Sequence, residues 1–276
     1  MSSNFLILSL DHCLGSLFSI QFIRFEQTKT DLKYLMGLMT DNSIVTSAYL
    51  TSLGFSYNSL FGYKKSGWID EFGRGAYCKH GQNPSLEATL SALHLQLNKP
   101  VRLGGRSALA QRGFLHFVPS RETHATIYAN RGVVLPAWFK SKFSKSIQLS
   151  ATTFLPPSIG INEASVNGFQ ILLSDPERAI LELIEQAPRT VQLNECYQIL
   201  DLMANLRPKL LNELLMYCTS VKVKRLFLLL AKDLNHQWFA KLDTQSFDLG
   251  SGCRVIDKDG SFNADFNVVV RPWRDI

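Results

Sequence analysis

The chain has 276 residues, of which 46% are hydrophobic and 19% are charged, a composition typical of one large or two smaller globular domains. Its five cysteines are odd in number and form no CxxC pair, which argues against a disulfide framework or a cysteine-based zinc cluster and favours a reducing cytoplasm. The net charge is +6, and residues 81–150 hold most of it, with nine basic and two acidic side chains. Residues 151–276 carry 13 basic and 15 acidic ones. The asymmetry predicts an anionic partner for the first half of the chain, unless the imbalance has no purpose.

The first 27 residues are apolar, but their pattern does not fit a membrane span or a signal peptide. Asp11 and His12 interrupt the apolar run after about six residues, and no basic residue precedes it. A spanning helix needs roughly 20 apolar residues. We interpret residues 1–27 as an N-terminal extension and predict a cytoplasmic protein without membrane contact.

Residues 28–80 show the pattern of three short helices followed by a hairpin. The helical segments are TDLKYLMGLM, DNSIVTSAYLTSLGFS and SYNSLFGYKKSG, and the hairpin runs from Trp68 to Lys79. Residues suited to cap or stop the helices are, in chain order, Thr30 or Asp31, Asn42 or Ser43, Gly54, Ser56 and Gly67. Three helices and a hairpin in this order predict a winged helix-turn-helix.

The tip of the hairpin, Gly73-Arg74-Gly75, has little side-chain bulk and a single cation. A wing that approaches a DNA duplex needs both features, because its backbone must come close to the phosphates and a positive charge must neutralise them. We therefore predict that Arg74 contacts DNA. In the alternative interpretation the winged helix serves protein contacts and Arg74 is merely solvated.

The third helix carries the other predicted DNA contacts. Ser56 and Tyr57 lie at its N-terminus, where free N–H groups favour phosphate. Asn58 is suited to read adenine, and Lys64 and Lys65 to hold phosphate.

The remaining residues, 81–276, predict a mixed α/β domain, with a boundary to the winged helix somewhere between residues 80 and 105. NPSLEATLSALHLQLNKP and SDPERAILELIEQ indicate helices, the second with a capping-box pair Ser174 and Glu177. Asn167-Gly168 indicates a tight hairpin. Further helices are predicted at about 193–205, 207–219 and 221–233, and strands in HFVPS, THATIYAN and KSIQLSATTFLP and near 247–256 and 265–270. The predicted fold class is α+β.

Three arginines of the basic stretch, Arg102, Arg106 and Arg112, crowd into one turn and short helix, VRLGGRSALAQRG. We predict that they extend the DNA-facing surface beside the wing. The same charge distribution predicts that residues 151–276 are dispensable for DNA binding.

No arrangement of residues indicates catalysis, a metal or a cofactor. The histidines show no metal-ligand spacing, and GGRSAL lacks the Lys-Ser/Thr ending of a phosphate loop. In DLGSGCRVIDKDG, too few residues separate Ser251 from Asp257 and Asp259 for the strand and helix of a nucleotidyltransferase site. The sequence predicts a protein that is not an enzyme.

The run GWIDEFGRGAYCKHG, followed by SLEATLSALHLQLNKPVRLGGRSALAQRGFLHFV, resembles the N-terminal half of AbiEi-family antitoxins of type IV toxin–antitoxin systems. The resemblance continues through SDPERAILELI, VKVKRLFLLLAKDLNHQWFAKLD, DLGSG and VVRP, and so covers about residues 30–274. The matching motif residues are Gly67, Trp68, Gly73, Gly75, Tyr77, Gly104, Gly105, Ala108, Leu109, Gly113, Phe114 and His116.

The resemblance implies a two-part antitoxin. Its winged helix would repress its own promoter by binding double-stranded DNA at inverted repeats, with a dimer on DNA as one arrangement. Its domain at 81–276 would oppose a nucleotidyltransferase-like toxin, with or without a stable complex. In VKVKRLFLLL, Val223, Leu226, Phe227 and Leu230 are predicted to be buried. This leaves Lys222, Lys224 and Arg225 either as a surface for the toxin or its nucleotide or tRNA substrate, or as a solvated face. The alternative function is a protein-interaction or RNA-binding winged-helix module without promoter binding.

Overall fold

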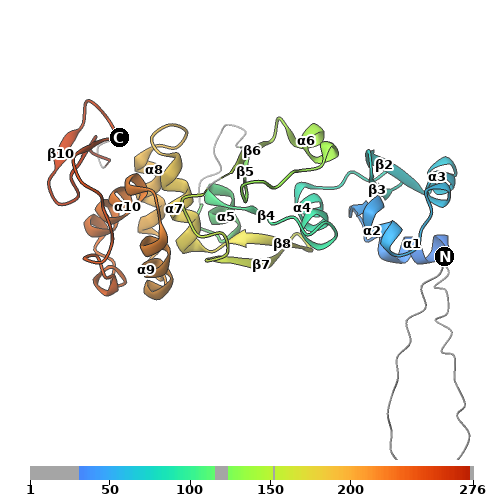
Figure 1. The fold of residues 1–276 in the computed structure, drawn as a ribbon, viewed down its shortest axis with the longest axis horizontal. Coiled ribbons are helices and arrows are strands. Elements are labelled where there is room, and N and C mark those ends of the chain that lie inside the picture. Colours follow the sequence, from blue (N-terminus) through green and yellow to red (C-terminus); the bar gives the residue numbers. More distant parts are fainter. Residues whose placement is uncertain (1–30, 116–123, 152, 274–276) are drawn as a thin grey trace, which may run out of the picture.

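The computed structural model describes residues 31–115, 124–151 and 153–273 and shows an elongated molecule (Figure 1). The winged helix forms one end, a five-stranded sheet with its helices forms the middle, and a helical group with a small sheet forms the other end. The N-terminal extension and the strand expected in HFVPS lie outside the described residues. The architecture is the predicted α+β arrangement.

The first region has the elements of a winged helix-turn-helix. They are α1 (Leu32–Leu38), β1 (Val45–Thr46), α2 (Ser47–Ser52), α3 (Tyr57–Lys65), β2 (Ile69–Gly73) and β3 (Ala76–Lys79), and the strands pair in the order β1-β3-β2. The caps predicted at Asp31 and Ser56 are confirmed, because each side chain accepts the backbone N–H three residues ahead. The cap predicted for the second helix is wrong: β1 precedes that helix, and Thr46 caps it.

Both faces of this small sheet are buried. On the inner face, Val45, Ile69 and Tyr77 pack with α1, α2 and α3 in a core of their own. On the outer face, Phe72 and Cys78 belong to the large core of the following region. The Gln96 side chain adds two hydrogen bonds of 2.8 Å each, to the Thr46 N–H and the Ile44 carbonyl. The winged helix is therefore docked on the rest of the protein.

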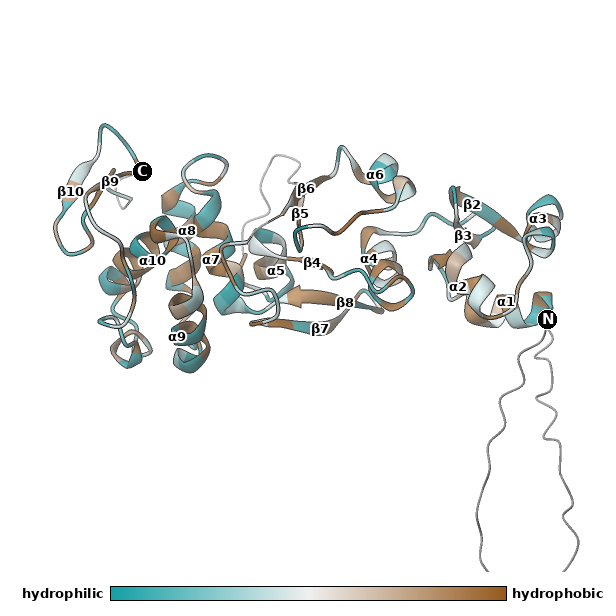
Figure 2. Cartoon of the chain, viewed as in Figure 1, coloured by the Kyte–Doolittle hydropathy of each residue, from teal (hydrophilic) through white to brown (hydrophobic). Residues whose placement is uncertain are grey.

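A mixed sheet of order β6-β5-β4-β8-β7 forms the middle region. Its strands are β4 (Val101–Leu103), β5 (Ala125–Ala129), β6 (Ile147–Ser150), β7 (Ile161–Val166) and β8 (Phe169–Ser174), and its helices are α4 (Leu86–Leu95), α5 (Gly105–Gln111) and α6 (Ala137–Phe143). β4 runs parallel to β8, and β5 to β6. The predicted hairpin at Asn167-Gly168 is confirmed, with φ of 51° and 83° at the two residues. Figure 2 shows β8 as mostly apolar.

The last region surrounds one central helix. α7 (Pro176–Gln186) is buried from Glu177 to Ile184 and contacts α5, α8, α9 and α10. The other elements are α8 (Leu193–Asp201), α9 (Pro208–Tyr217), α10 (Val221–Leu234), η1 (Phe239–Lys241), β9 (Arg254–Val255), β10 (Ser261–Asn263) and β11 (Val268–Val270). The three strands form a sheet of order β10-β11-β9, of which β10 was not expected from the sequence. None of the described helices has the length and apolarity to cross a membrane.

The capping box predicted for α7 is wrong. Asp175 is the N-cap residue, and its side chain makes no capping hydrogen bond. The Ser174 hydroxyl instead donates to the Glu182 carboxylate at 2.9 Å, and Glu177 accepts from Arg207. Both residues of the expected box therefore serve longer-range contacts that the local pattern does not show.

Candidate nucleic-acid interface

The solvent-facing side of α3 carries the residues from which DNA contacts are predicted. Leu60 anchors the helix in the winged-helix core, while Tyr57, Asn58 and Lys65 are exposed on the outside. Phe61 lies on the same exposed side, one turn after Tyr57. The arrangement presents two aromatic rings, an amide and an ammonium group to solvent.

Two other predicted contact residues of this helix already have partners. The Ser56 hydroxyl accepts the Ser59 N–H at 3.0 Å and lies 2.7 Å from the Ser59 hydroxyl, so its first role is to cap α3. The Lys64 ammonium forms an ion pair with Glu71 on the wing, which raises the pKa of Lys64. This pair neutralises a carboxylate that would otherwise repel phosphate beside the helix.

The hairpin tip combines two glycines with different roles. Gly75 has φ +86°, and its carbonyl accepts the Ser47 N–H at 2.9 Å. Gly73 lies against α6, where a Cβ on residue 73 would come within 2.5 Å of the Trp138 Cβ. Arg74, between them, is exposed. One side of the tip is therefore covered by the protein itself, and Arg74 remains accessible.

Helix α6 lies beside the wing and was not predicted from the sequence. The Phe72 ring meets the Trp138 ring edge-on at 6.1 Å, and the Lys142 ammonium lies 5.0 Å from the centre of the Phe72 ring. Lys140, Lys142 and Lys145 are exposed. These three lysines belong to the basic stretch 81–150: Lys140 and Lys142 lie in α6 beside the wing, and Lys145 follows that helix. The signal in the sequence was WFKSKF, in which aromatic residues and lysines stand together within one short segment.

The prediction that Arg102 faces DNA is wrong. Arg102 is 2% exposed, and its guanidinium donates to Glu182 at 2.9 Å and to the Ser174 hydroxyl at 3.2 Å. Glu182 also accepts from Arg178 at 2.8 Å and from the Gly105 N–H at 2.9 Å. Burial lowers the pKa of Arg178, the nearby Glu182 carboxylate opposing that shift. This cluster joins β4, α5, β8 and α7 inside the protein.

Arg106 and Arg112 lie away from the wing. Arg106 forms an ion pair with Glu195 of α8 at 3.0 Å, and Arg112 pairs with Asp175 at 3.3 Å. Arg106 lies in α5 and Arg112 directly follows it, and Figure 1 shows α5 beside α7. The prediction that the three arginines crowd beside the wing is therefore wrong in its geometry.

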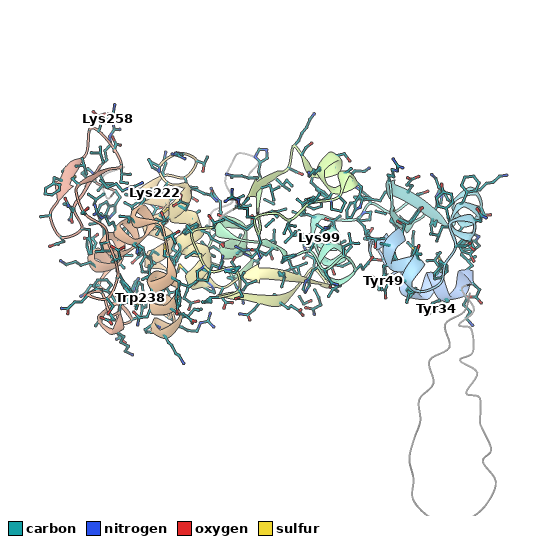
Figure 3. The ribbon with its side chains drawn as sticks, in the orientation of Figure 1. Tyr34, Tyr49, Lys99, Lys222, Trp238 and Lys258 are labelled. Atoms are coloured by element: carbon teal, nitrogen blue, oxygen red, sulfur yellow. The ribbon has the colours of Figure 1, made fainter. Side chains whose placement is uncertain are left out.

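The predicted toxin-facing cations do not form a surface. Arg225 is 2% exposed and donates to the carbonyls of Leu249, Gly250, Gly252 and Asn267 at 2.7–3.1 Å, and Lys224 is also buried. The Lys222 ammonium binds the carbonyls of Glu185 and Ala187. Figure 3 shows Lys222 among the helices, whereas Lys258 projects at the outer end. The expected core residues Val223, Leu226, Phe227 and Leu230 are buried, as predicted.

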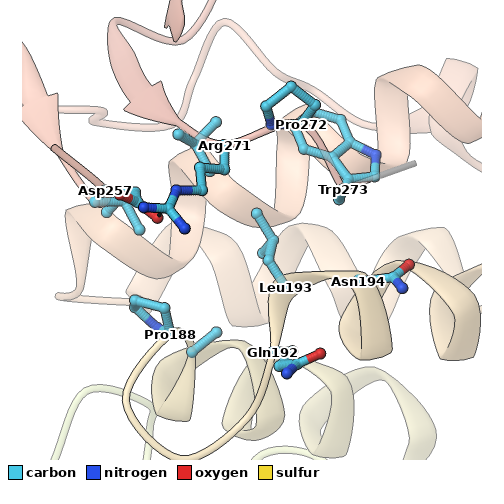
Figure 4. A pocket seen from close by; sticks show the side chains of 11 residues that line it. Pro188, Gln192, Leu193, Asn194, Asp257, Arg271, Pro272 and Trp273 are labelled. Carbon is cyan, nitrogen blue, oxygen red and sulfur yellow. Dashed lines mark ion pairs between the residues drawn. The ribbon is translucent and has the colours of Figure 1, made fainter. Parts of the chain in front are cut away.

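A pocket of about 200 Å³ lies between the start of α8 and the C-terminal sheet (Figure 4). Leu193, Pro272 and Trp273 line it, and an ion pair of 3.0 Å joins Asp257 to Arg271. Asp259 pairs with the same arginine, so both carboxylates of the DKDG turn are engaged. Among the described residues, no group of three or more His, Cys, Asp or Glu side chains is placed to hold a metal ion.

The described cysteines are free thiols, and three of the four are buried. Burial raises the pKa of Cys218 to about 11 and also raises the pKa values of Cys78 and Cys196. These three thiols are therefore held in their neutral form at physiological pH, as packing residues.

Two family models together cover most of the chain. Residues 28–120 match the AbiEi antitoxin N-terminal domain of transcriptional regulators. Residues 122–271 match the transcriptional regulator, AbiEi antitoxin, of type IV toxin–antitoxin systems. The chain belongs to the AbiEi antitoxin family. It is accordingly a transcriptional-regulator antitoxin, as the resemblance of its motifs predicted.

A solved structure supports the fold of this AbiEi antitoxin. The RV2827C protein from Mycobacterium tuberculosis is similar over 86% of this chain and 89% of its own, with a TM-score of 0.58 and 14% identity. At that identity the likeness extends to the fold alone. No curated protein matches the chain.

The Glu182 cluster explains why the family motif has glycine at positions 104 and 105. A Cβ on Gly104 would come within 2.4 Å of the Glu182 carboxylate and equally close to the Tyr128 ring. Gly105 has φ +49° and donates its N–H to Glu182. The Gly-Gly pair thus makes room for a buried carboxylate and begins α5, rather than binding a phosphate.

Proposed function

We propose that this antitoxin represses its own promoter by binding double-stranded DNA through α3, Arg74 and the lysines of α6. The observation that carries the proposal is the exposed face of α3 in a protein of a transcriptional-regulator family. Asn58 supplies a base contact, and Arg74 and Lys65 supply phosphate contacts. The exposed lysines of α6, a helix that packs against Phe72 of the wing, supply further phosphate contacts beside the wing.

The proposal includes a cytoplasmic protein that opposes a nucleotidyltransferase-like toxin without catalysis of its own. Support comes from the family, whose members are antitoxins of type IV systems. Inverted repeats in the promoter and a dimer on DNA are part of the proposal. Because Lys224 and Arg225 are buried, we propose that any surface of residues 81–276 that opposes the toxin lies outside the VKVKR segment.

A gel shift with the DNA upstream of the protein's own gene tests the proposal. We expect specific binding that weakens with salt, a loss of affinity for all DNA in Arg74→Ala, and relaxed discrimination at one base pair in Asn58→Ala, at a cost of about 1–3 kcal/mol. Lys258→Ala, at the far end of the molecule, is the matched loss of one charge and should bind as wild type does. If Arg74→Ala binds specific and random DNA as wild type does at every salt concentration, the wing does not contact DNA.

A further inference from the structure

Two large aromatic side chains project from the exposed face of α3. Tyr57 is 75% exposed and Phe61 57%, although side chains of this size are usually buried in large part. They lie one helical turn apart, beside Asn58, so all three face the same side. No described part of the chain covers these two rings, and their exposed apolar area indicates that they contact another molecule.

We propose that Phe61, flanked by Tyr57, recognises the 5-methyl group of thymine in the major groove of DNA. The inference rests on the proposed DNA binding and specifies what the helix reads. A phenyl ring has no hydrogen-bonding group, so it gains free energy in a groove only by apolar contact. The thymine methyl is the apolar group that a base pair presents at the major-groove edge.

The surroundings of Phe61 favour nucleic acid over an apolar protein surface. Lys65 follows Phe61 by one turn, Arg74 lies on the wing, and both are exposed cations. Gly62 comes directly after Phe61, and a Cβ at that position would have no neighbour within 4 Å. The helix therefore presents a bare backbone site next to the ring, which allows a close approach to the floor of the groove.

Asn58 complements this reading. Its amide is suited to bind adenine in a bidentate manner, and adenine pairs with thymine. A helix that places an amide and a phenyl ring on neighbouring turns can therefore contact both bases of one A·T pair, or two successive pairs. The resulting preference is for A·T-containing sites read from the major groove.

The test compares two duplexes with the sequence upstream of the protein's own gene. They are identical except that uracil replaces every thymine in one of them. The replacement removes the methyl groups and leaves the phosphates and hydrogen-bonding edges in place. For wild type we expect about fourfold weaker binding for each contacted methyl, from roughly 0.8 kcal/mol per buried carbon group and 1.4 kcal/mol per tenfold. The salt slope should be the same for the two duplexes, because the phosphate contacts do not change.

Variants connect the effect to the ring. Phe61→Ala should bind thymine DNA more weakly and no longer distinguish it from uracil DNA, whereas Phe61→Leu should keep part of the preference. Phe262→Ala is the matched control, because Phe262 is 58% exposed on β10 at the other end of the molecule. It should retain the full preference of wild type, and thermal melts should show that all three variants are folded.

The outcomes separate the thymine contact from the proposed promoter binding. A thymine preference that disappears in Phe61→Ala and persists in Phe262→Ala supports the inference. Specific binding by wild type without any difference between the two duplexes overturns it and leaves the proposed promoter binding intact. No binding of wild type to either duplex at low salt refutes the promoter binding itself, and the aromatic face then serves a protein partner.

Discussion

Gly73 and Gly75 flank the same arginine, but the structure requires glycine at the two positions for different reasons. Gly75 has φ +86°, a conformation that a β-branched residue tolerates poorly. Gly73 is needed because Trp138 of α6 occupies the place of its side chain. From the sequence we explained both glycines of the tip by the close approach of a DNA duplex. The structure shows that Gly73 is required by packing inside the protein instead.

Gly73→Ala should therefore destabilise the protein without any DNA present. Its Cβ would lie 2.5 Å from the Trp138 Cβ, so the wing or α6 has to move, and overpacking of this kind costs about 1–3 kcal/mol. Gly62→Ala is the matched control, because the same substitution there meets no atom within 4 Å and should stabilise α3 by roughly 0.5–1 kcal/mol. Denaturant unfolding measures both values, and equal midpoints for the two variants would contradict the packing explanation.

Arg225 has a structural role, because its buried guanidinium holds four backbone carbonyls. Arg225→Met should lower the free energy of unfolding by at least about 3 kcal/mol, because a charged hydrogen bond is worth roughly 1.5–3 kcal/mol and several carbonyls lose their donor. Lys232→Met is the control: its pair with Asp265 is solvent-exposed and worth about 0–1 kcal/mol. Urea titrations give both values. An Arg225→Met protein as stable as wild type that failed only to neutralise toxin would restore the surface role predicted from the sequence.

At the scale of elements, several local signals were predictable from the sequence, whereas the distant partners of side chains were not. The caps Asp31 and Ser56 and the Asn167-Gly168 turn depend on residues within a few positions, and all three were identified. Arg102 pairs with Glu182, which lies 80 residues further along the chain. Because the sequence does not show this pairing, the charge of Arg102 was wrongly assigned to a DNA-facing surface. Helix α6 is short, and its aromatic residues are fixed by packing against β2, which the segment itself does not encode.

Lys140 and Lys142 of α6 and Lys145, just after its end, should contribute to DNA binding as a group. Lys140→Gln, Lys142→Gln and Lys145→Gln combined should reduce the salt slope of binding by about 0.9 for each phosphate that is no longer neutralised, and should weaken specific and random DNA binding alike. The control carries the same change of three charges at the opposite end, with glutamine at Lys209, Lys241 and Lys258. Binding isotherms at several salt concentrations compare them. Equal slopes for the two triple variants would show that only net charge matters and that α6 does not touch DNA.

At the scale of the whole molecule, the division of charge does not coincide with a division of structure. A cut near residue 150 would separate β4 from its partner β8 and remove Glu182 from Arg102. The large core extends from Ile44 to Val270 and includes the outer face of the winged-helix sheet. The dispensability of residues 151–276 for DNA binding therefore has to be tested by substitutions in the intact chain, since a truncation there leaves Arg102 without its partner and exposes the edge of β4.

Phe72 is the position at which the winged helix can be uncoupled. Its ring lies on the outer face of β2 against Trp138 and Phe143 and takes no part in the core formed by α1, α2 and α3. Phe72→Ala should remove about 3–5 kcal/mol of packing between the two regions and leave the winged-helix core formed by α1, α2 and α3 intact. We expect one calorimetric transition to split into two, with faster hydrogen exchange in β2 and β3.

DNA binding by Phe72→Ala distinguishes the roles of the two surfaces. α3 keeps its own core, so sequence discrimination should persist, whereas the salt slope should fall to that of the α6 triple variant, because α6 is no longer held beside the wing. Tyr217→Ala, at a 62% exposed ring on α9, is the control and should change neither calorimetry nor binding. If Phe72→Ala still unfolds in one transition and keeps the wild-type salt slope, α6 does not depend on the Phe72 ring, and the winged helix and the sheet behind it do not act as one DNA-binding surface.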